Sequence, residues 1–319
     1  MKRLMTVVVL FAGLWAGYWW FGITQLRSAV TQGLAQIPDR VTLGDWSAQG
    51  FPSRFDIDIR EAQLRGPNWQ WDVPQAEIMA MAWAPTRLIV WAGVPQTLSV
   101  YGQTFEINAQ DMRANVDFAA RGSLPLEKVI AVMEAPQVSG LVADQARLAL
   151  QSIPDGADET TQASARYRIG GALTNVRSES LTSDAVTPAN VAWDAQIALP
   201  APIDRVMLQS GVLPRAQSID LTKLTIDWAG ASVAASGQLT VLPSGYLDGP
   251  VDLELQNIDQ VIALLRESNI MPASQIDLID RALRAIGRGD GSVSVPLRFA
   301  GGQTMLAGLF RIGPAPRLP

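Results

Sequence analysis

The stretch Phe55-Asp56-Ile57-Asp58-Ile59 alternates apolar and acidic side chains at every position. In a β-strand successive side chains point to opposite faces, so this period of two places the apolar residues on one face and both aspartates on the other. The stretch therefore predicts a strand with one dry face, which packs against apolar groups, and one wet face, which meets water.

The same alternation recurs along most of the chain after residue 38. In the first half it predicts further strands at Trp69–Val73, Phe105–Ala109 and Val116–Phe118. In the second half it predicts strands at Ile219–Leu221, Leu224–Trp228, Val251–Leu255 and Val293–Phe299. Turn-forming residues such as Pro243-Ser244-Gly245 separate these segments, and short strands joined by tight turns predict an antiparallel meander.

Two helices are expected near the C-terminus, at residues 258–267 and 274–286. The second has an apolar face at helical spacing, made of Ile276, Ile279, Leu283 and Ile286. The predicted fold class is mainly β: an N-terminal transmembrane helix followed by an extended antiparallel meander sheet with these two helices. The sequence leaves open whether the sheet forms a groove, a sandwich or an open barrel.

The N-terminal segment has the pattern of a membrane anchor. Lys2 and Arg3 precede an uncharged run from Leu4 to Ile23, which as a helix spans about 30 Å, the thickness of a hydrocarbon core. The positive-inside rule places the N-terminus in the cytoplasm and everything after Thr24 outside it. The predicted anchor residues are Leu4, Leu10, Leu14, Trp19 and Trp20, the last two belonging to an interfacial aromatic belt. A cleaved secretory signal is the alternative, and it also exports the rest of the chain.

The predicted organisation has five parts. Residues 1–23 form the anchor, and residues 24–38 form an amphipathic stalk helix ended by Pro38. Residues 39–153 are a first β-rich half, and residues 188–319 are a second β-rich half with the two helices. Between them, residues 154–187 are rich in Ser, Thr, Asp and Gly around one predicted strand, which indicates a boundary region.

Composition excludes several classes of function. The chain contains no cysteine and no histidine, which excludes disulfides, thiolate nucleophiles and Ser-His-Asp catalysis. The net charge of −5 argues against nucleic acid, because that affinity comes from clustered Lys and Arg. Asp56 and Asp58 share a strand face and are the one carboxylate pair suited to glycan hydrolysis, although a solvated face explains them better. No catalytic residue, cofactor or metal is predicted.

Hydrophobic residues make up 48% of the chain and charged residues only 17%, below the roughly 25% of an average soluble domain. Either the core is large or some apolar surface has another purpose. Among the ten tryptophans, Trp69, Trp71 and Trp83 are the candidates for gripping an acyl chain, with core packing as the alternative.

Three segments carry a family resemblance: Gly50–Asp56 with Trp83-Ala84-Pro85, Gly237–Leu255, and Asp290–Gly302 with Leu309–Pro316. With the anchor ahead of them, they resemble the uncharacterised Gram-negative envelope family catalogued as domain of unknown function 2125. The second and third are also similar to the C-terminal part of AsmA-like envelope proteins. This resemblance implies an inner-membrane anchor and a periplasmic β-groove that in some relatives handles phospholipid, and it brings no catalytic residues.

These observations predict a non-enzymatic protein of the bacterial inner membrane, single-pass, with its β-rich part in the periplasm. Its expected partners are the inner membrane and a phospholipid or other hydrophobic component of the cell envelope. A scaffold or assembly factor that binds envelope proteins through strand edges is the alternative.

Overall fold

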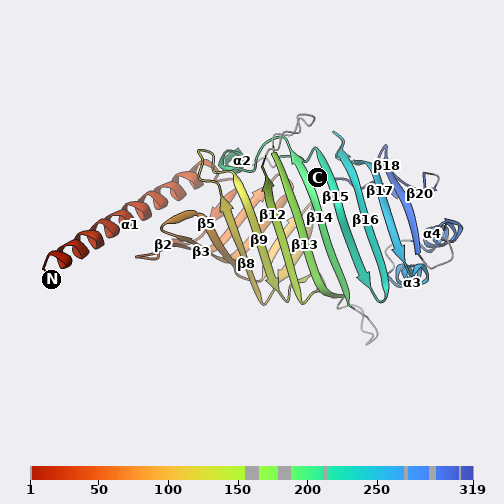
Figure 1. The fold of residues 1–319 in the computed structure, drawn as a ribbon, viewed down its shortest axis with the longest axis horizontal. Helices are drawn as coiled ribbons and strands as arrows, with labels where there is room; N and C mark the ends of the chain where they lie inside the picture. The colour runs from red at the N-terminus through yellow and green to blue at the C-terminus, as the bar shows by residue number, and fades with distance from the viewer. Residues whose placement is uncertain are drawn as a thin grey trace. The chain divides into compact units, whose positions relative to one another are not determined.

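A computed structural model describes residues 2–154, 165–178, 188–210, 214–268, 272–286, 292–308 and 310–318 (Figure 1). These residues are mainly β, all their strand pairs are antiparallel, and they include four helices. The chain divides into two compact units, Met1–Ser139 with Ile203–Leu213 and Gly140–Pro202 with Pro214–Pro319. The predicted mainly β, antiparallel class is thus confirmed.

The first unit is a branched antiparallel sheet with two helices, α1 (Lys2–Gln36) and α2 (Arg205–Ser210). Its strands are β1 (Val41–Leu43), β2 (Trp46–Gln49), β3 (Arg54–Gly66), β4 (Trp69–Met81), β5 (Ala84–Ala92), β6 (Gln96–Val100), β7 (Gln103–Asn108), β8 (Asp111–Phe118), β9 (Leu126–Glu134) and β10 (Gln137–Val138). The branch lies at β4, which pairs with β6 near its start and with β5 near its end.

Helix α1 runs without interruption through the predicted anchor and the predicted stalk, and it ends at Gln36, just before Pro38. The helix is amphipathic where it meets the sheet: Ile23 is 4% exposed and packs with Ala48, Phe55 and Ala82. Residues 24–36 are therefore helical as predicted, but the helix already contacts the β structure at Trp15, inside the predicted anchor.

The second unit is a meander in which β12 to β20 each pair with the next strand in the sequence. Its strands are β11 (Leu141–Val142), β12 (Gln145–Ile153), β13 (Ala165–Ser178), β14 (Ala189–Leu199), β15 (Ser218–Trp228), β16 (Ala231–Val241), β17 (Leu247–Gln256), β18 (Ser292–Ala300), β19 (Gln303–Leu306) and β20 (Phe310–Pro314). The short β11 pairs with the end of β13.

Strand β15 joins two segments that the sequence predicted as separate strands. Ile219–Leu221 and Leu224–Trp228 alternate out of phase with each other, and the register with both neighbouring strands shifts between Leu221 and Leu224. This β-bulge at Thr222 and Lys223 restores the phase, so that Leu221 and Leu224 lie on the same face of the sheet.

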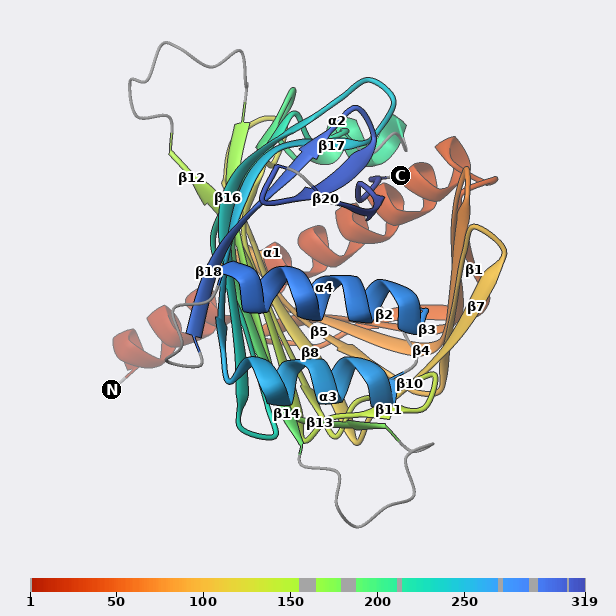
Figure 2. The same cartoon turned by 90° about the vertical axis from the view of Figure 1, so that its right-hand side faces the viewer.

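Helices α3 (Ile258–Ser268) and α4 (Ala273–Ile286) confirm the two predicted C-terminal helices. They lie side by side against one face of the sheet near β16, β17 and β18 (Figure 2). Ile262, Ile276 and Leu283 are each 2% exposed and pack with Val293 and Val295 of β18. The apolar stripe of each helix thus forms the core of this end of the unit.

The chain passes from the first unit to the second after Ser139 and returns to the first for Ile203–Leu213, whereas the sequence placed a boundary region at residues 154–187. Within that region, β13 pairs along its length with β12 and β14 and lies inside the second sheet. Residues 155–164 and 179–187 lie outside the described residues. The loop-rich composition there flanks a strand and does not coincide with the division between the two units.

Candidate functional site

The sheet of the second unit has one apolar face, which we call the dry face. Strand register aligns its side chains in rows that cross six strands, β13 to β18. One row is Gly171, Trp193, Leu224, Ala235, Leu253 and Val295, and the next is Leu173, Val191, Ile226, Val233, Leu255 and Val293. A third row is Ile169, Ala195, Leu221, Gly237, Val251 and Leu297. No charged side chain interrupts these rows.

The dry face differs in burial from one end to the other. Near β16 to β18, where α3 and α4 pack, Ala235, Leu255 and Val295 are buried. Toward β13, β14 and β15, the row residues Trp193, Leu221, Leu224 and Ile226 are only partly buried. On β12, Leu148 pairs with Gly171 and is 37% exposed. Apolar side chains therefore remain available for contact along the half of the sheet away from the two helices.

Trp193 gives the dry face a broad, flat element. A Cβ atom added at Gly171, its partner on β13, would come within 2.2 Å of the indole Cζ2 atom, so the ring lies directly over the glycine backbone. A flat aromatic ring beside aliphatic side chains is well suited to contact an acyl chain. Sequence reasoning missed Trp193, although it sits in the alternating segment Val191-Ala192-Trp193-Asp194-Ala195.

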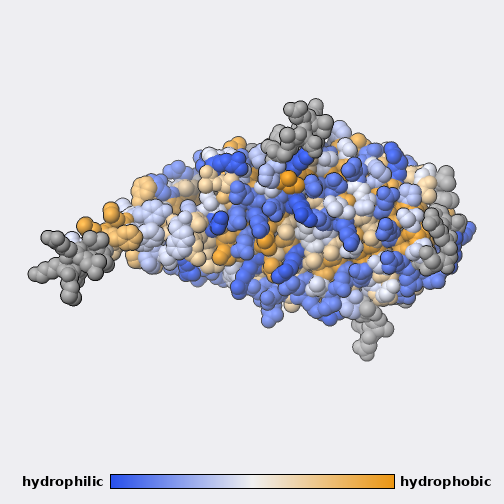
Figure 3. All heavy atoms as spheres, in the orientation of Figure 1, coloured by the Kyte–Doolittle hydropathy of each residue, from blue (hydrophilic) through white to orange (hydrophobic). Residues whose placement is uncertain are grey.

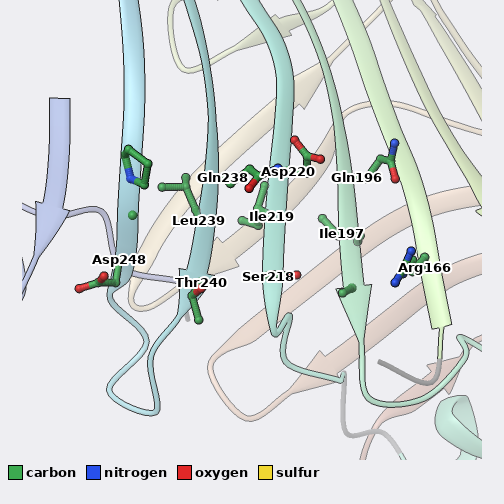
Figure 4. A pocket seen from close by; sticks show the side chains of 13 residues that line it. Arg166, Gln196, Ile197, Ser218, Ile219, Asp220, Gln238, Leu239, Thr240 and Asp248 are labelled. Atoms are coloured by element: carbon green, nitrogen blue, oxygen red, sulfur yellow. The ribbon is translucent and has the colours of Figure 1, made fainter. Parts of the chain in front are cut away.

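The opposite face is polar, as Figure 3 shows for the side chains over β13 to β16. It carries a shallow groove of about 560 Å³ formed by β13 to β17, with Arg166, Gln196, Asp220, Gln238 and Asp248 among its lining residues (Figure 4). The groove mixes charges of both signs and amides across neighbouring strands. Ile197, Ile219 and Leu239 also line it, so the groove combines polar side chains with aliphatic ones.

An ion pair stands on this polar face. Arg168 of β13 donates two hydrogen bonds to Asp194 of β14, at 2.8 and 2.6 Å. These hydrogen bonds hold the pKa of Asp194 below its ordinary value, with a smaller opposing effect of burial. Arg168 is exposed and Asp194 is partly exposed, so the pair joins β13 to β14 and contributes little to stability.

The three predicted ligand-binding tryptophans do not form one site. Trp69 and Trp71 share a face of β4, whereas Trp83 follows the far end of that strand and is 64% exposed. The Trp71 indole Nε1 donates to Oε1 of Gln96, and Nε2 of the same fully buried glutamine donates to the Gly93 carbonyl. Trp71 is therefore held in a packed polar contact that a ligand would have to break.

The predicted anchor residues fall into two groups on α1. Leu10, Leu14 and Trp20 are 62%, 74% and 68% exposed, whereas Trp19 packs against Phe55 with ring centroids 6.4 Å apart. Leu4 belongs to residues 1–5 and 7–9, whose side chains lie outside the described part of the structure. Figure 3 shows hydrophobic side chains along the described outer turns of this helix.

Among the described residues, the structure contains no helix whose length and hydropathy would allow it to cross a membrane.

Helix α1 packs against two turns of the first unit, residues 50–54 and residues 82–83. We call these two turns together the docking rim. The Ala82 amide donates to the Ser53 carbonyl at 2.9 Å, which ties the two turns together. Three α1 side chains donate to rim carbonyls: Trp15 Nε1 to Pro52 at 2.8 Å, Tyr18 Oη to Ala82 at 2.8 Å and Trp19 Nε1 to Arg54 at 2.9 Å. These contacts join positions 35 to 64 residues apart in the chain, so local sequence patterns did not indicate them.

The candidate carboxylate pair is engaged in structural contacts. Asp56 is 5% exposed and forms an ion pair with Arg54 at 3.0 Å, while Asp58 accepts a hydrogen bond from Gln49 at 2.8 Å. Within the described ranges, acidic side chains form no group able to hold a metal ion.

Comparison with known proteins places these features in a family. The sequence profile of the family described as "Uncharacterized protein conserved in bacteria (DUF2125)" matches residues 19–316. No curated protein and no solved structure gives a significant match. The match begins at Trp19 of the docked helix and covers both β-rich units. The chain therefore belongs to this bacterial family, as its three characteristic segments predicted.

Proposed function

We propose that this chain is a non-enzymatic protein of the bacterial cell envelope that binds a lipid or another hydrophobic envelope component on the dry face of its second unit. The observation that carries the proposal is the set of apolar rows across β13 to β15, whose side chains are only partly buried, with the exception of the buried Ala195. Soluble proteins rarely leave a contiguous apolar surface of this kind without a partner. Polar residues on both faces would favour a scaffold, and here one face is apolar.

The proposal includes location. Lys2 and Arg3 followed by an apolar helix favour insertion in the inner membrane with the N-terminus in the cytoplasm and both β units in the periplasm. The exposed Leu10, Phe11 and Leu14 support this placement, because they present an apolar surface that the first unit does not cover. The likeness of the C-terminal segments to AsmA-like proteins stays a prediction that agrees with it.

The test is lipid extraction and native mass spectrometry of the full chain, purified in mild detergent from bacterial membranes. The full chain is needed because α1 packs into the core of the first unit through Ile23. Leu224→Gln places an amide on the dry face, and Thr225→Gln introduces the same amide one residue away, on the polar face.

We expect a co-purifying amphiphile in the wild type and in the Thr225→Gln variant. Burial of one Leu side chain contributes about 1.5–3 kcal/mol. The Leu224→Gln variant should therefore bind the amphiphile with an affinity lower by roughly tenfold or more. A lipid-free wild type with intact β structure would overturn the proposal and direct the search to protein partners by cross-linking. An equal loss of the co-purified amphiphile in both variants would also overturn the proposal.

A further inference from the structure

We infer that the docking rim is a second membrane contact: the turns 50–54 and 82–83 enter the headgroup region of the bilayer beside α1. The inference rests on the proposed anchoring by α1 and adds a separate claim about the β structure. The occupant it assigns to this surface is the phospholipid interface of the membrane that holds the helix.

The first argument is the depth at which α1 meets the rim. The rim accepts hydrogen bonds from Trp15, Tyr18 and Trp19. If the apolar run ends at Ile23 on the outer side, a rise of 1.5 Å per residue puts these three residues about 6 to 12 Å inside that end. The turns that touch them must lie at a similar depth. The apolar face of an amphipathic helix that lies on a membrane sinks about 5–10 Å, to the boundary between headgroups and acyl chains. The turns of the rim would lie at about the same depth.

The second argument is the chemistry of the exposed side chains. Phe51 is 57% exposed, Trp83 is 64% exposed and Met81, at the end of β4, is 39% exposed. Phe51 also contacts Trp19 edge-on, with ring centroids 5.2 Å apart, so the exposed rim residues continue the surface of the helix. Aromatic residues at such a position favour a membrane interface, where ring and polar groups are both accommodated.

The third argument is that the backbone carbonyls of the rim accept hydrogen bonds from α1. A carbonyl without a hydrogen-bond donor is strongly disfavoured in a poorly hydrated layer, so irregular backbone enters a membrane only when its polar groups are bonded within the protein. The carbonyls of Pro52, Arg54 and Ala82 each accept a side-chain donor from α1 at 2.8 to 2.9 Å. The helix thus supplies the donors that water would supply to an ordinary exposed turn.

The absence of native cysteine makes a direct test possible. Single cysteines replace Met81, Trp83, Leu14 or Tyr101 in the full chain, each is labelled with an environment-sensitive fluorophore, and the protein is reconstituted in vesicles of phosphatidylethanolamine and phosphatidylglycerol. Tyr101 is the matched control, because it is an aromatic residue of the same unit, 57% exposed, on the turn between β6 and β7. Leu14 reports on the anchor itself.

Labels at positions 81 and 83 should be quenched by shallow spin-labelled lipids and protected from aqueous iodide, whereas the label at 101 should show the reverse. Protection at position 14 with full iodide access at 81 and 83 overturns the rim inference and leaves the anchor in place. Iodide access at position 14 as well means that the proposed anchoring has failed, and the rim inference fails with it. Position 83 lies in the rim and position 81 lies beside it at the end of β4, so the test stays valid if one of the two variants does not fold.

Discussion

At Gly22 the helix α1 lies close against Phe55 of β3, and a single methyl group tests that contact. A Cβ atom at Gly22 would lie 2.8 Å from Cζ of Phe55, a distance that real side chains do not tolerate. Phe55 is 8% exposed and its ring stacks on Trp19, so it has little freedom to move away. Overpacking of this kind typically costs about 1–3 kcal/mol.

The matched control is Gly17→Ala on the same helix, where nothing lies within 4 Å of the added methyl group. Alanine in place of glycine stabilises a helix interior by about 0.5–1 kcal/mol, and this gain is common to both variants. The difference between Gly22→Ala and Gly17→Ala therefore isolates the contact with Phe55, at about 1–3 kcal/mol.

Amide hydrogen exchange at the docking rim measures this difference. The Arg54 amide donates to the Gly50 carbonyl, and the Ala82 amide donates to the Ser53 carbonyl, so both report on the rim beneath α1. We expect these amides to exchange about tenfold faster or more in Gly22→Ala than in Gly17→Ala, since 1.4 kcal/mol is a factor of ten. Equal exchange in the two variants would refute the close docking of α1 on Phe55.

Three further predictions concern the stability of the two units. Gln96→Leu leaves the Trp71 indole without its acceptor and should lower the free energy of unfolding by about 2–3 kcal/mol in denaturant titrations; no decrease would contradict the packed role of Trp71. Leu283→Ala should cost about 2–5 kcal/mol in the same assay because Leu283 is 2% exposed beneath α4, whereas Arg281→Ala on the exposed side of α4 should change it by less than about 0.5 kcal/mol. Asp194→Asn should slightly reduce stability at neutral pH; because the pKa of Asp194 is lowered in the fold, the difference from wild type should vanish as the pH falls through that lowered value, and a difference that persists in acid would contradict the ion pair.

The strands and the C-terminal helices were predictable because each depends on a local period. The alternation in Val251–Leu255 and in Val293–Phe299 predicts that each strand has one apolar face. In the structure the two segments pair with each other, and their apolar residues are direct partners. The bulge in β15 was not predictable in the same way, because two short segments out of phase also fit two separate strands. Only the register with β14 and β16 shows that they form one strand.

The candidate site was predicted less well, because the exposure of each tryptophan and the docking of α1 on the strands depend on contacts between residues far apart in the sequence. Trp69, Trp71 and Trp83 look alike in sequence, yet Trp71 bonds to a buried glutamine while Trp83 lies exposed on a turn. Trp19 is predicted to belong to an interfacial aromatic belt, and nothing in the sequence indicated that its indole donates to the Arg54 carbonyl at the start of β3. The alternating pattern did contain the dry face, but not the information that its β13 to β15 half is only partly buried.

The most direct test of lipid binding is site-specific photocross-linking on β15 in living cells. Benzoylphenylalanine placed at Leu221 lies on the dry face, and the same group placed at Asp220 lies on the polar face, one residue away. The account predicts a covalent phospholipid or other amphiphile adduct, detected by mass spectrometry, from position 221 and none from position 220. No adduct at 221, or equal adducts at both positions, would contradict the claim that the dry face binds lipid.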